Sequence, residues 1–233
     1  MSQTIAYFRG WRFNRQSGGI EGLWPLDPEQ LPFEHCRLVY DEQGRLACIE
    51  EHGRDRPLPA VKVLGYASQD SSRIVEALDY NPDGSLRLIH RYVYDEEGRM
   101  CDRVELDGEG KPRGHVASVW ADGAEAEERV YSHREELTWV HQYEYDGQGR
   151  VIRERILAGG ETLDGVREMD YDPAGNVIEK RWLDPAGELQ SRFMHSYDDR
   201  GLILTSTLMG SDGEVRGRKT FEYDEAGNVT SET

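Results

Sequence analysis

The sequence predicts an all-β protein, an antiparallel meander of about eight two-stranded repeats of about 26 residues that form a long, twisted or curled sheet. Three observations predict it. A tyrosine turn pattern recurs along the chain, a glycine or proline interrupts nearly every window of helical length, and aromatic residues alternate in the segments beside the turns. The 12 Tyr and 5 Trp in a chain of mean hydropathy −0.75 indicate a thin, aromatic-rich core.

The repeat is marked by Tyr, then Asp or Asn, then two residues and Gly. Its copies begin at Tyr40, Tyr80, Tyr94, Tyr145, Tyr171, Tyr197 and Tyr223. From Tyr145 onward the copies are 26 residues apart. The same step from Tyr94 reaches Trp120, and from Tyr40 it reaches Tyr66. We interpret Trp120 and Tyr66 as decayed copies, so that each repeat supplies two strands and two turns.

The residues of these turns suit a hairpin bend. Asp at the first position can accept hydrogen bonds from the backbone two residues on, and Gly permits positive φ at the end of the turn. Pro173 and Pro185 supply a φ near −65° where a turn requires it. A type I turn followed by a bulge is therefore expected. In the last repeat, alternation places Lys219, Phe221 and Tyr223 on one face of a strand.

The domain organisation expected is an irregular N-terminal cap over residues 1–35 and one continuous repeat array over 36–233. The cap contains the aromatic residues Trp11, Trp24 and Phe33 and the prolines Pro25, Pro28 and Pro32. An irregular insert is expected near 120–139. Within it, the helix formers of Ala124–Arg129 predict a short helix or an acidic loop.

Charge limits the partners of the chain. The 45 acidic and 28 basic residues give a net charge of −17. Nucleic acid is not an expected partner, because its binding requires a basic surface. A basic protein partner would be attracted. The alternative, which this pattern leaves open, is that the acidic surface only keeps a protein rich in β-strands soluble.

Location and redox state follow from what the sequence lacks. No run of 18 apolar residues and no secretion signal occur, so neither a membrane span nor secretion is expected. The three cysteines, Cys36, Cys48 and Cys101, are widely spaced and are expected to be free thiols in a reducing cytoplasm. A monomer is favoured.

Sequence signals for catalysis, metals and cofactors are missing. The calcium-binding and zinc-binding spacings are absent, and so are the nucleophile elbow and the phosphate-binding loop. His90 and His141 fall four residues before a repeat tyrosine, and we interpret them as strand residues on the tyrosine's own face. Paired carboxylates such as Asp198 and Asp199 are interpreted as solvated charge. We therefore expect no enzyme activity, no cofactor and no metal.

A family resemblance rests on the segment from Arg91 to Met100, which reads Arg-Tyr-Val-Tyr-Asp-Glu-Glu-Gly-Arg-Met and resembles the YD, or Rhs-type, repeat. The match recurs around Tyr145, Tyr171 and Tyr223 and extends over nearly all of Leu38–Val229. In that family the repeats wind into long β-sheets, and large members enclose toxin domains. Eight units are too few to enclose such a domain. The resemblance therefore implies a β-scaffold associated with bacterial toxin systems.

The function that we expect is a non-catalytic scaffold for protein–protein interaction. The leading hypothesis is an immunity protein, or antitoxin, that binds and neutralises a cognate bacterial toxin of the Rhs or type VI kind, a cationic effector such as a nuclease. The alternative is a structural or carbohydrate-binding fragment of an Rhs-like surface protein. We expect the toxin to contact the region 120–139, because insertions on one face of an array often bind partners. The candidate contact residues are Trp120, Asp122, Glu125, Glu127, Glu128, Tyr131, Glu135, Glu136 and Trp139. The alternative for each of them is that it only repairs a degenerate repeat.

Overall fold

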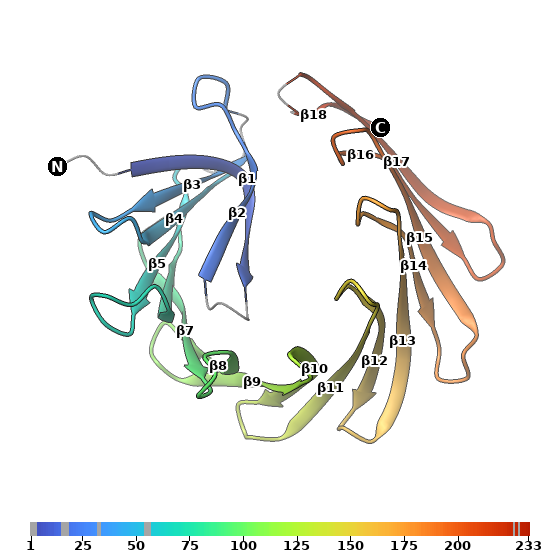
Figure 1. Ribbon diagram of the computed structural model, residues 1–233, viewed down its shortest axis with the longest axis horizontal. Helices are drawn as coiled ribbons and strands as arrows, with labels where there is room; N and C mark the ends of the chain where they lie inside the picture. The colour runs from blue at the N-terminus through green and yellow to red at the C-terminus, as the bar shows by residue number, and fades with distance from the viewer. Residues whose placement is uncertain (1–3, 15–18, 32–33, 54–56, 226, 228) are drawn as a thin grey trace. The chain divides into compact units, whose positions relative to one another are not determined.

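The computed structural model describes residues 4–14, 19–31, 34–53, 57–225, 227 and 229–233, and every structural statement below concerns those residues. They contain eighteen strands and no helix, hence no helix able to span a membrane (Figure 1). Two residues of the expected cap, Pro32 and Phe33, lie outside the described residues, as does the side chain of Trp24. The predicted all-β class is confirmed.

The chain forms two compact units. Unit 1 consists of Met1–Ser118 and Tyr131–Glu136, and unit 2 consists of Val119–Val130 and Leu137–Thr233. The first nine strands are β1 (Thr4–Asn14), β2 (Gly19–Pro25), β3 (His35–Tyr40), β4 (Leu46–His52), β5 (Ala60–Tyr66), β6 (Ile74–Tyr80), β7 (Leu86–Tyr94), β8 (Met100–Asp107) and β9 (Pro112–Ala121). The other nine are β10 (Ala124–Ser132), β11 (Leu137–Tyr145), β12 (Val151–Ala158), β13 (Thr162–Tyr171), β14 (Val177–Leu183), β15 (Leu189–Tyr197), β16 (Ile203–Gly210), β17 (Val215–Tyr223) and β18 (Val229–Glu232).

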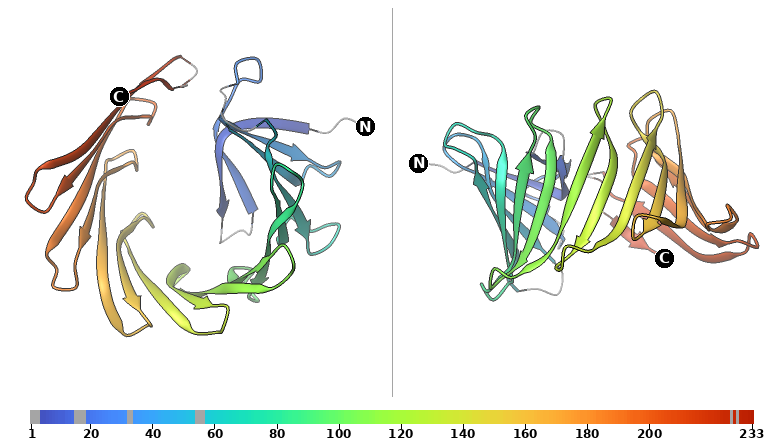
Figure 2. Two further views of the ribbon diagram at one scale, coloured as in Figure 1. Left: turned by 180° about the vertical axis from the view of Figure 1, so that it is seen from behind. Right: turned by 90° about the horizontal axis from the view of Figure 1, so that it is seen from below.

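Successive strands pair antiparallel within each unit, which is the predicted meander. In unit 1 the pairing runs from β3 to β9, and in unit 2 it runs from β11 to β18 (Figure 2). Such local hairpin pairing needs only short connections.

The turn after Tyr171 illustrates how the repeat bends the chain. Asp172 Oδ1 accepts a hydrogen bond of 2.9 Å from the Asn176 amide, and the Gly175 amide donates one of 3.0 Å to the Asp172 carbonyl. Gly175 has φ 92°, a conformation that glycine adopts without steric cost. The register shifts by one residue at Asp170 and Tyr171. The predicted turn with a bulge is confirmed here.

The repeat tyrosines form a ladder of hydrogen bonds across the strands. Six of them among the described residues donate the phenol hydroxyl to the backbone carbonyl 20 residues earlier, and they are Tyr66, Tyr94, Tyr145, Tyr171, Tyr197 and Tyr223. Because each bond runs from the end of one strand to the beginning of the strand before it, the tyrosine ties two neighbouring strands together beside the turn. Burial raises the pKa of Tyr171, so its hydroxyl keeps its proton at neutral pH. This geometry supports the interpretation of these residues as structural stripes.

Residues Ala124–Arg129 were expected to form a short helix or an acidic loop, and this expectation is wrong: they belong to strand β10. Asp122 and Gly123 have φ 50° and 80°, the positive values of a two-residue type I′ turn, which directs the chain into a hairpin. Side chains of β11 then hold β10 in place. Tyr145 donates to the Glu125 carbonyl at 2.8 Å, and Gln142 donates to the Glu127 carboxylate at 3.0 Å. These cross-strand bonds outweigh the helix propensity of Ala and Glu.

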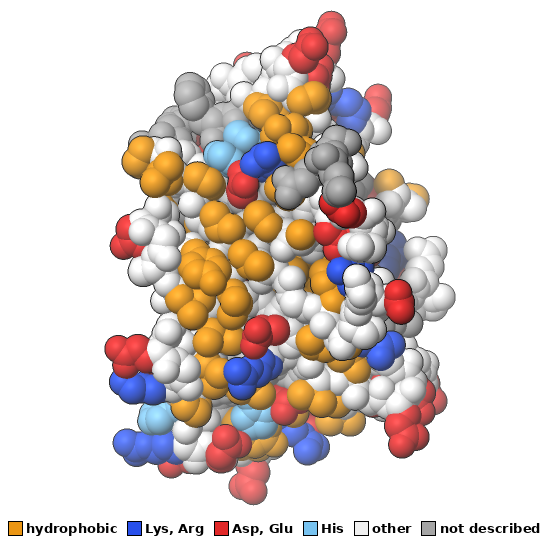
Figure 3. All heavy atoms as spheres, turned by 90° about the vertical axis from the view of Figure 1, so that its left-hand side faces the viewer, with side chains coloured by type: hydrophobic (Ala, Val, Ile, Leu, Met, Phe, Trp, Pro, Cys, Tyr) orange, Lys and Arg blue, Asp and Glu red, His pale blue; other side chains and the backbone are white. Residues whose placement is uncertain are grey.

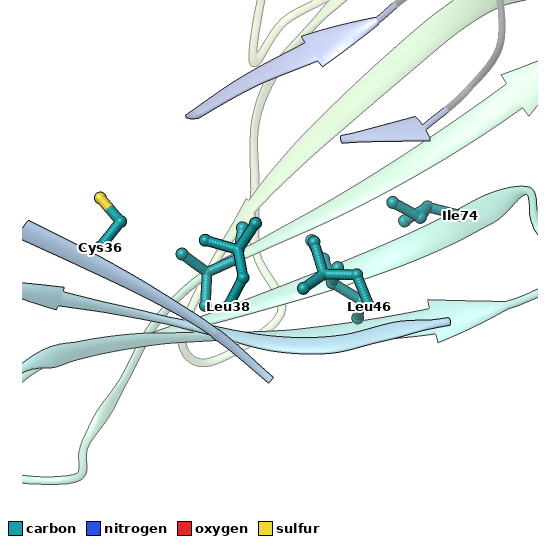
Figure 4. Packing of buried hydrophobic residues seen from close by; sticks show 7 residues of the cluster. Cys36, Leu38, Leu46 and Ile74 are labelled. Carbon is teal, nitrogen blue, oxygen red and sulfur yellow. The ribbon is translucent and has the colours of Figure 1, made fainter. Parts of the chain in front are cut away.

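The core of unit 1 lies beneath the N-terminal segment expected to form a cap. That segment contains two strands, and β1 pairs with both β2 and β3. Its partly buried side chains Phe8, Trp11 and Phe13 pack on a buried cluster. The cluster consists of Cys36, Leu38, Leu46, Ile49, Leu64, Ile74 and Ala77 (Figure 4). Figure 3 shows hydrophobic side chains gathered on one face of the molecule, with charged side chains both among them and at the margins.

Candidate protein-binding surface

The nine predicted contact residues fall in both units. Unit 2 contains Trp120 at the end of β9, Asp122 in the turn, Glu125, Glu127 and Glu128 on β10, and Trp139 on β11. Unit 1 contains Tyr131 at the end of β10 and Glu135 and Glu136 in the next turn.

In unit 1 the three predicted residues are engaged by neighbouring groups. The ring of Tyr131 stacks on His115 with a centroid separation of 4.4 Å, and Glu135 Oε2 lies 3.1 Å from His115 Nε2. The Glu136 amide and its carboxylate both contact the Ser132 hydroxyl. Glu135 has φ 61° at the place where the repeat turns carry glycine. These contacts favour the structural alternative for Tyr131, Glu135 and Glu136.

In unit 2, Trp139 is the aromatic side chain among the predicted contact residues that is exposed to solvent. Its side chain is 38% exposed, whereas the acidic residues of β10 are partly buried and Glu127 is bonded to Gln142 and Arg129. Burial opposes ionisation of Glu127, but the hydrogen bonds from Gln142 and Arg129 outweigh it and lower the pKa of this carboxyl, so it is charged at neutral pH. Trp139 thus provides exposed apolar contact area in unit 2.

Trp139 belongs to a larger surface that we name the tyrosine face of unit 2. Residues that pair directly across antiparallel strands share a face, and alternate residues of one strand do so too. The register accordingly places these side chains together: Trp139, His141, Tyr143, Glu154, Ile156, Arg167, Met169, Lys180, Trp182, Phe193, His195 and Leu208. His141 therefore lies on the tyrosines' face, as predicted from its sequence position.

Large apolar groups are exposed in this part of unit 2. Phe193 on β15 is 41% exposed. Ile152, Ile178 and Leu204 occupy the same place in successive repeats, 26 residues apart, and are 37%, 38% and 38% exposed. Exposed apolar side chains repeated along a sheet in this way could contribute to an interaction surface.

A network of polar side chains within the tyrosine face connects its strands. Glu154 is buried, accepts a hydrogen bond of 3.1 Å from Arg167, and has its Oε1 2.7 Å from His141 Nδ1. Burial opposes ionisation of this carboxyl, but the contacts with His141 and Arg167 outweigh it and lower its pKa. Arg167 in turn lies over the Trp182 ring at 5.3 Å. The ionised carboxylate therefore fixes side chains from three strands.

A pocket of about 510 Å³ opens on the tyrosine face between β13, β14 and β15. Its lining includes the cations Arg167, Lys180 and Arg181 and the rings of Trp182, Phe193 and His195, with no carboxylate. Burial and the charge of Lys180 lower the pKa of His195, which leaves the imidazole neutral at pH 7. Sequence inspection missed this pocket. The signal available was the half-repeat spacing of 13 residues, which separates cross-strand partners such as Lys180 and Phe193.

A second pocket, of about 310 Å³, lies in unit 1 and differs in charge. There Lys62 pairs with the buried Asp79, which also lies 3.4 Å from His90 Nε2. Trp11 covers Lys62, with the ammonium 5.4 Å from the indole ring. The cations that line this pocket are therefore balanced by acidic groups in the same lining. Among the described residues, no group of three or more His, Cys, Asp or Glu could hold a metal ion.

Comparison with known proteins adds weak structural similarities. The chain matches no protein-family model and no curated protein. It is similar to the solved structure of a porin-like protein from Bacteroides uniformis ATCC 8492, with 8% identity, a TM-score of 0.46, and coverage of 89% of this chain and 91% of that one. It is also similar to TcdB2-TccC3, with 15% identity, a TM-score of 0.30, and coverage of 89% of this chain but only 12% of that one. Similarity at this level assigns neither a family nor a function.

Proposed function

We propose that this protein is a non-catalytic binding scaffold, and that its partner protein occupies the tyrosine face of unit 2. The observation that carries the proposal is the exposure of Trp139 and Phe193, at 38% and 41%, on this face. In unit 1, side chains of β1 cover the corresponding face of the sheet. Aromatic side chains of this size supply much of the energy of protein interfaces.

The partner that we propose is a cationic bacterial toxin, which would make this chain a cytoplasmic immunity protein. The net charge of −17 would speed the encounter with a basic protein, and apolar contacts on the tyrosine face would then hold the complex. The turn and strand signature of the YD repeat supports a place in toxin systems. No catalytic role is included in this proposal.

The experiment is co-expression with the product of a toxin gene adjacent to the gene for this chain, followed by co-purification and a toxicity assay. The variant Trp139→Ser with Phe193→Ser should lose the complex and restore toxicity. The control Val93→Ser removes a side chain that is 49% exposed in unit 1 and should change neither. Raising the salt concentration should slow association.

Two results would contradict the proposal. In one, the toxin kills cells that express the wild-type chain and no complex forms. In the other, the complex forms equally well with the double variant, which would move the interface away from the tyrosine face.

A further inference from the structure

We infer that the pocket between β13, β14 and β15 is a binding site for a small aromatic anion, a planar ring that carries a carboxylate or a phosphate. This goes beyond the proposed function, because such a ligand would bind without any partner protein. A pocket of about 510 Å³ has the size of a small-molecule site.

The charge inside the pocket favours an anion. Arg167 is paired with Glu154 at 3.1 Å, and Arg181 is paired with Asp170 at 2.6 Å. Lys180 is exposed and has no carboxylate partner among the residues that the structure describes. One positive charge thus stays uncompensated in a chain of net charge −17, at a point with no lining carboxylate. An ammonium group on a flexible stem suits a carboxylate or a phosphate.

The walls favour a planar ring on that anion. Phe193 and His195 are nearly parallel, with an interplanar angle of 10° and a centroid separation of 6.4 Å. Trp182 is held in place by Arg167 on β13. Lys180 pairs directly with Phe193 across β14 and β15, so the charge lies beside the exposed ring. A ligand ring could contact these apolar surfaces while its anionic group reaches Lys180.

His195 provides a polar contact inside the pocket. Its Nδ1 is buried and has no hydrogen-bond partner among the described residues. Buried polar atoms are normally satisfied, so an unsatisfied one lining a pocket is a position for a ligand atom or a water molecule. Lys180 thus offers charge, and His195 offers directionality.

The test is titration of the whole chain with 1-naphthoate and with 1-naphthyl phosphate, followed by the NMR shift of the Trp182 indole resonance. We expect saturable binding of at least one anion, and the tighter of the two identifies the anionic group. The neutral analogue 1-naphthalenemethanol should bind about tenfold more weakly or not at all. Lys180→Gln should weaken anion binding by about tenfold, and Lys180→Arg should retain it.

The matched control is Lys219→Gln, because Lys219 lies on the same face but is paired with Glu232 at 2.6 Å outside the pocket. It should leave binding unchanged. The inference is overturned if neither anion shifts the Trp182 resonance or if the alcohol binds as tightly as the anions. It is also overturned if Lys180→Gln and Lys219→Gln change anion binding equally.

Discussion

Unit 1 and unit 2 use the same repeat, but among the described residues only unit 1 has a strand that packs over the side of the sheet with Tyr40, Tyr66 and Tyr92, its tyrosine face. There β1 places Phe13 against Tyr92, with stacked rings 4.7 Å apart, and Trp11 over Lys62. Leu38 and Ile49 beneath it are 0% exposed. In unit 2 the strands β11 to β18 all belong to one meander, so none of these described strands lies across the face. Phe193 and Trp139 remain exposed there.

The difference shows that the repeat supplies a sheet but leaves one of its faces to be covered by something else. In both units, tyrosine hydroxyls and turn carboxylates satisfy the backbone within the sheet. In unit 1 aromatic residues that precede the repeats bury the remaining apolar area. In unit 2 an ion-pair network around Glu154 connects β11, β12 and β13, and we propose that a partner covers the exposed apolar area.

The largest expected effect separates the covered core from the uncovered face. Leu38→Ala should cost about 3 kcal/mol of unfolding free energy, because it leaves a cavity in a fully buried cluster. Phe193→Ala in unit 2 should cost less than about 1 kcal/mol, since this ring is 41% exposed. Urea denaturation followed by hydrogen exchange in each unit measures both. If the two variants lose equal unfolding free energy, the contrast between a covered face in unit 1 and an uncovered face in unit 2 is wrong.

A second prediction concerns the network that supports the uncovered face. The folded-state pKa of Glu154 is lowered, so its stabilisation is fully present above the ordinary Glu value of 4.5 and is lost as the pH falls through the lower folded-state value. Glu154→Gln should cost about 1 to 2 kcal/mol at pH 7 and flatten this acid limb. The check is unfolding free energy against pH. If the loss of stability at low pH is the same in Glu154→Gln as in the wild type, the ionised Glu154 carboxylate does not stabilise the fold.

A third prediction tests what the units share. Tyr66→Phe in unit 1 and Tyr171→Phe in unit 2 should each cost about 1 kcal/mol, because each deletes one ladder hydrogen bond, of 2.6 Å and 2.7 Å. Tyr80→Phe is the control, since that hydroxyl has no hydrogen bond to a described residue. The stability of the three variants is measured by thermal unfolding. A loss confined to one unit would show that the ladder depends on the cover.

The smallest expected effect concerns a predicted contact residue. Glu135→Gly should stabilise unit 1 by about 0.5 to 1 kcal/mol, because glycine adopts the φ of 61° without steric cost. Loss of the contact with His115 opposes this gain only slightly, since the Glu135 side chain is 77% exposed. Chemical denaturation measures the sign. A destabilised variant would mean that the His115 contact outweighs the backbone strain.

Sequence reasoning identified the fold because the repeat encodes it locally. Tyr171, Asp172 and Gly175 perform in the structure the roles that turn chemistry assigns to them. The strand β10 was missed, because its Ala and Glu residues favour a helix and only its pairing with β11 makes it a strand. The contact residues proposed around Trp139 remain a prediction. The pocket could not be read directly, since Arg167, Lys180 and Phe193 meet only through strand register.

The most direct measurement of the central claim is hydroxyl-radical footprinting of the free chain and of its complex with the partner, resolved by residue. In the free chain, Trp139 and Phe193 should be modified far faster than Phe13, which β1 packs against the covered face of unit 1. In the complex, Trp139 and Phe193 should become protected while the modification of Phe13 stays unchanged. Unprotected Trp139 and Phe193 in a stable complex would contradict the account.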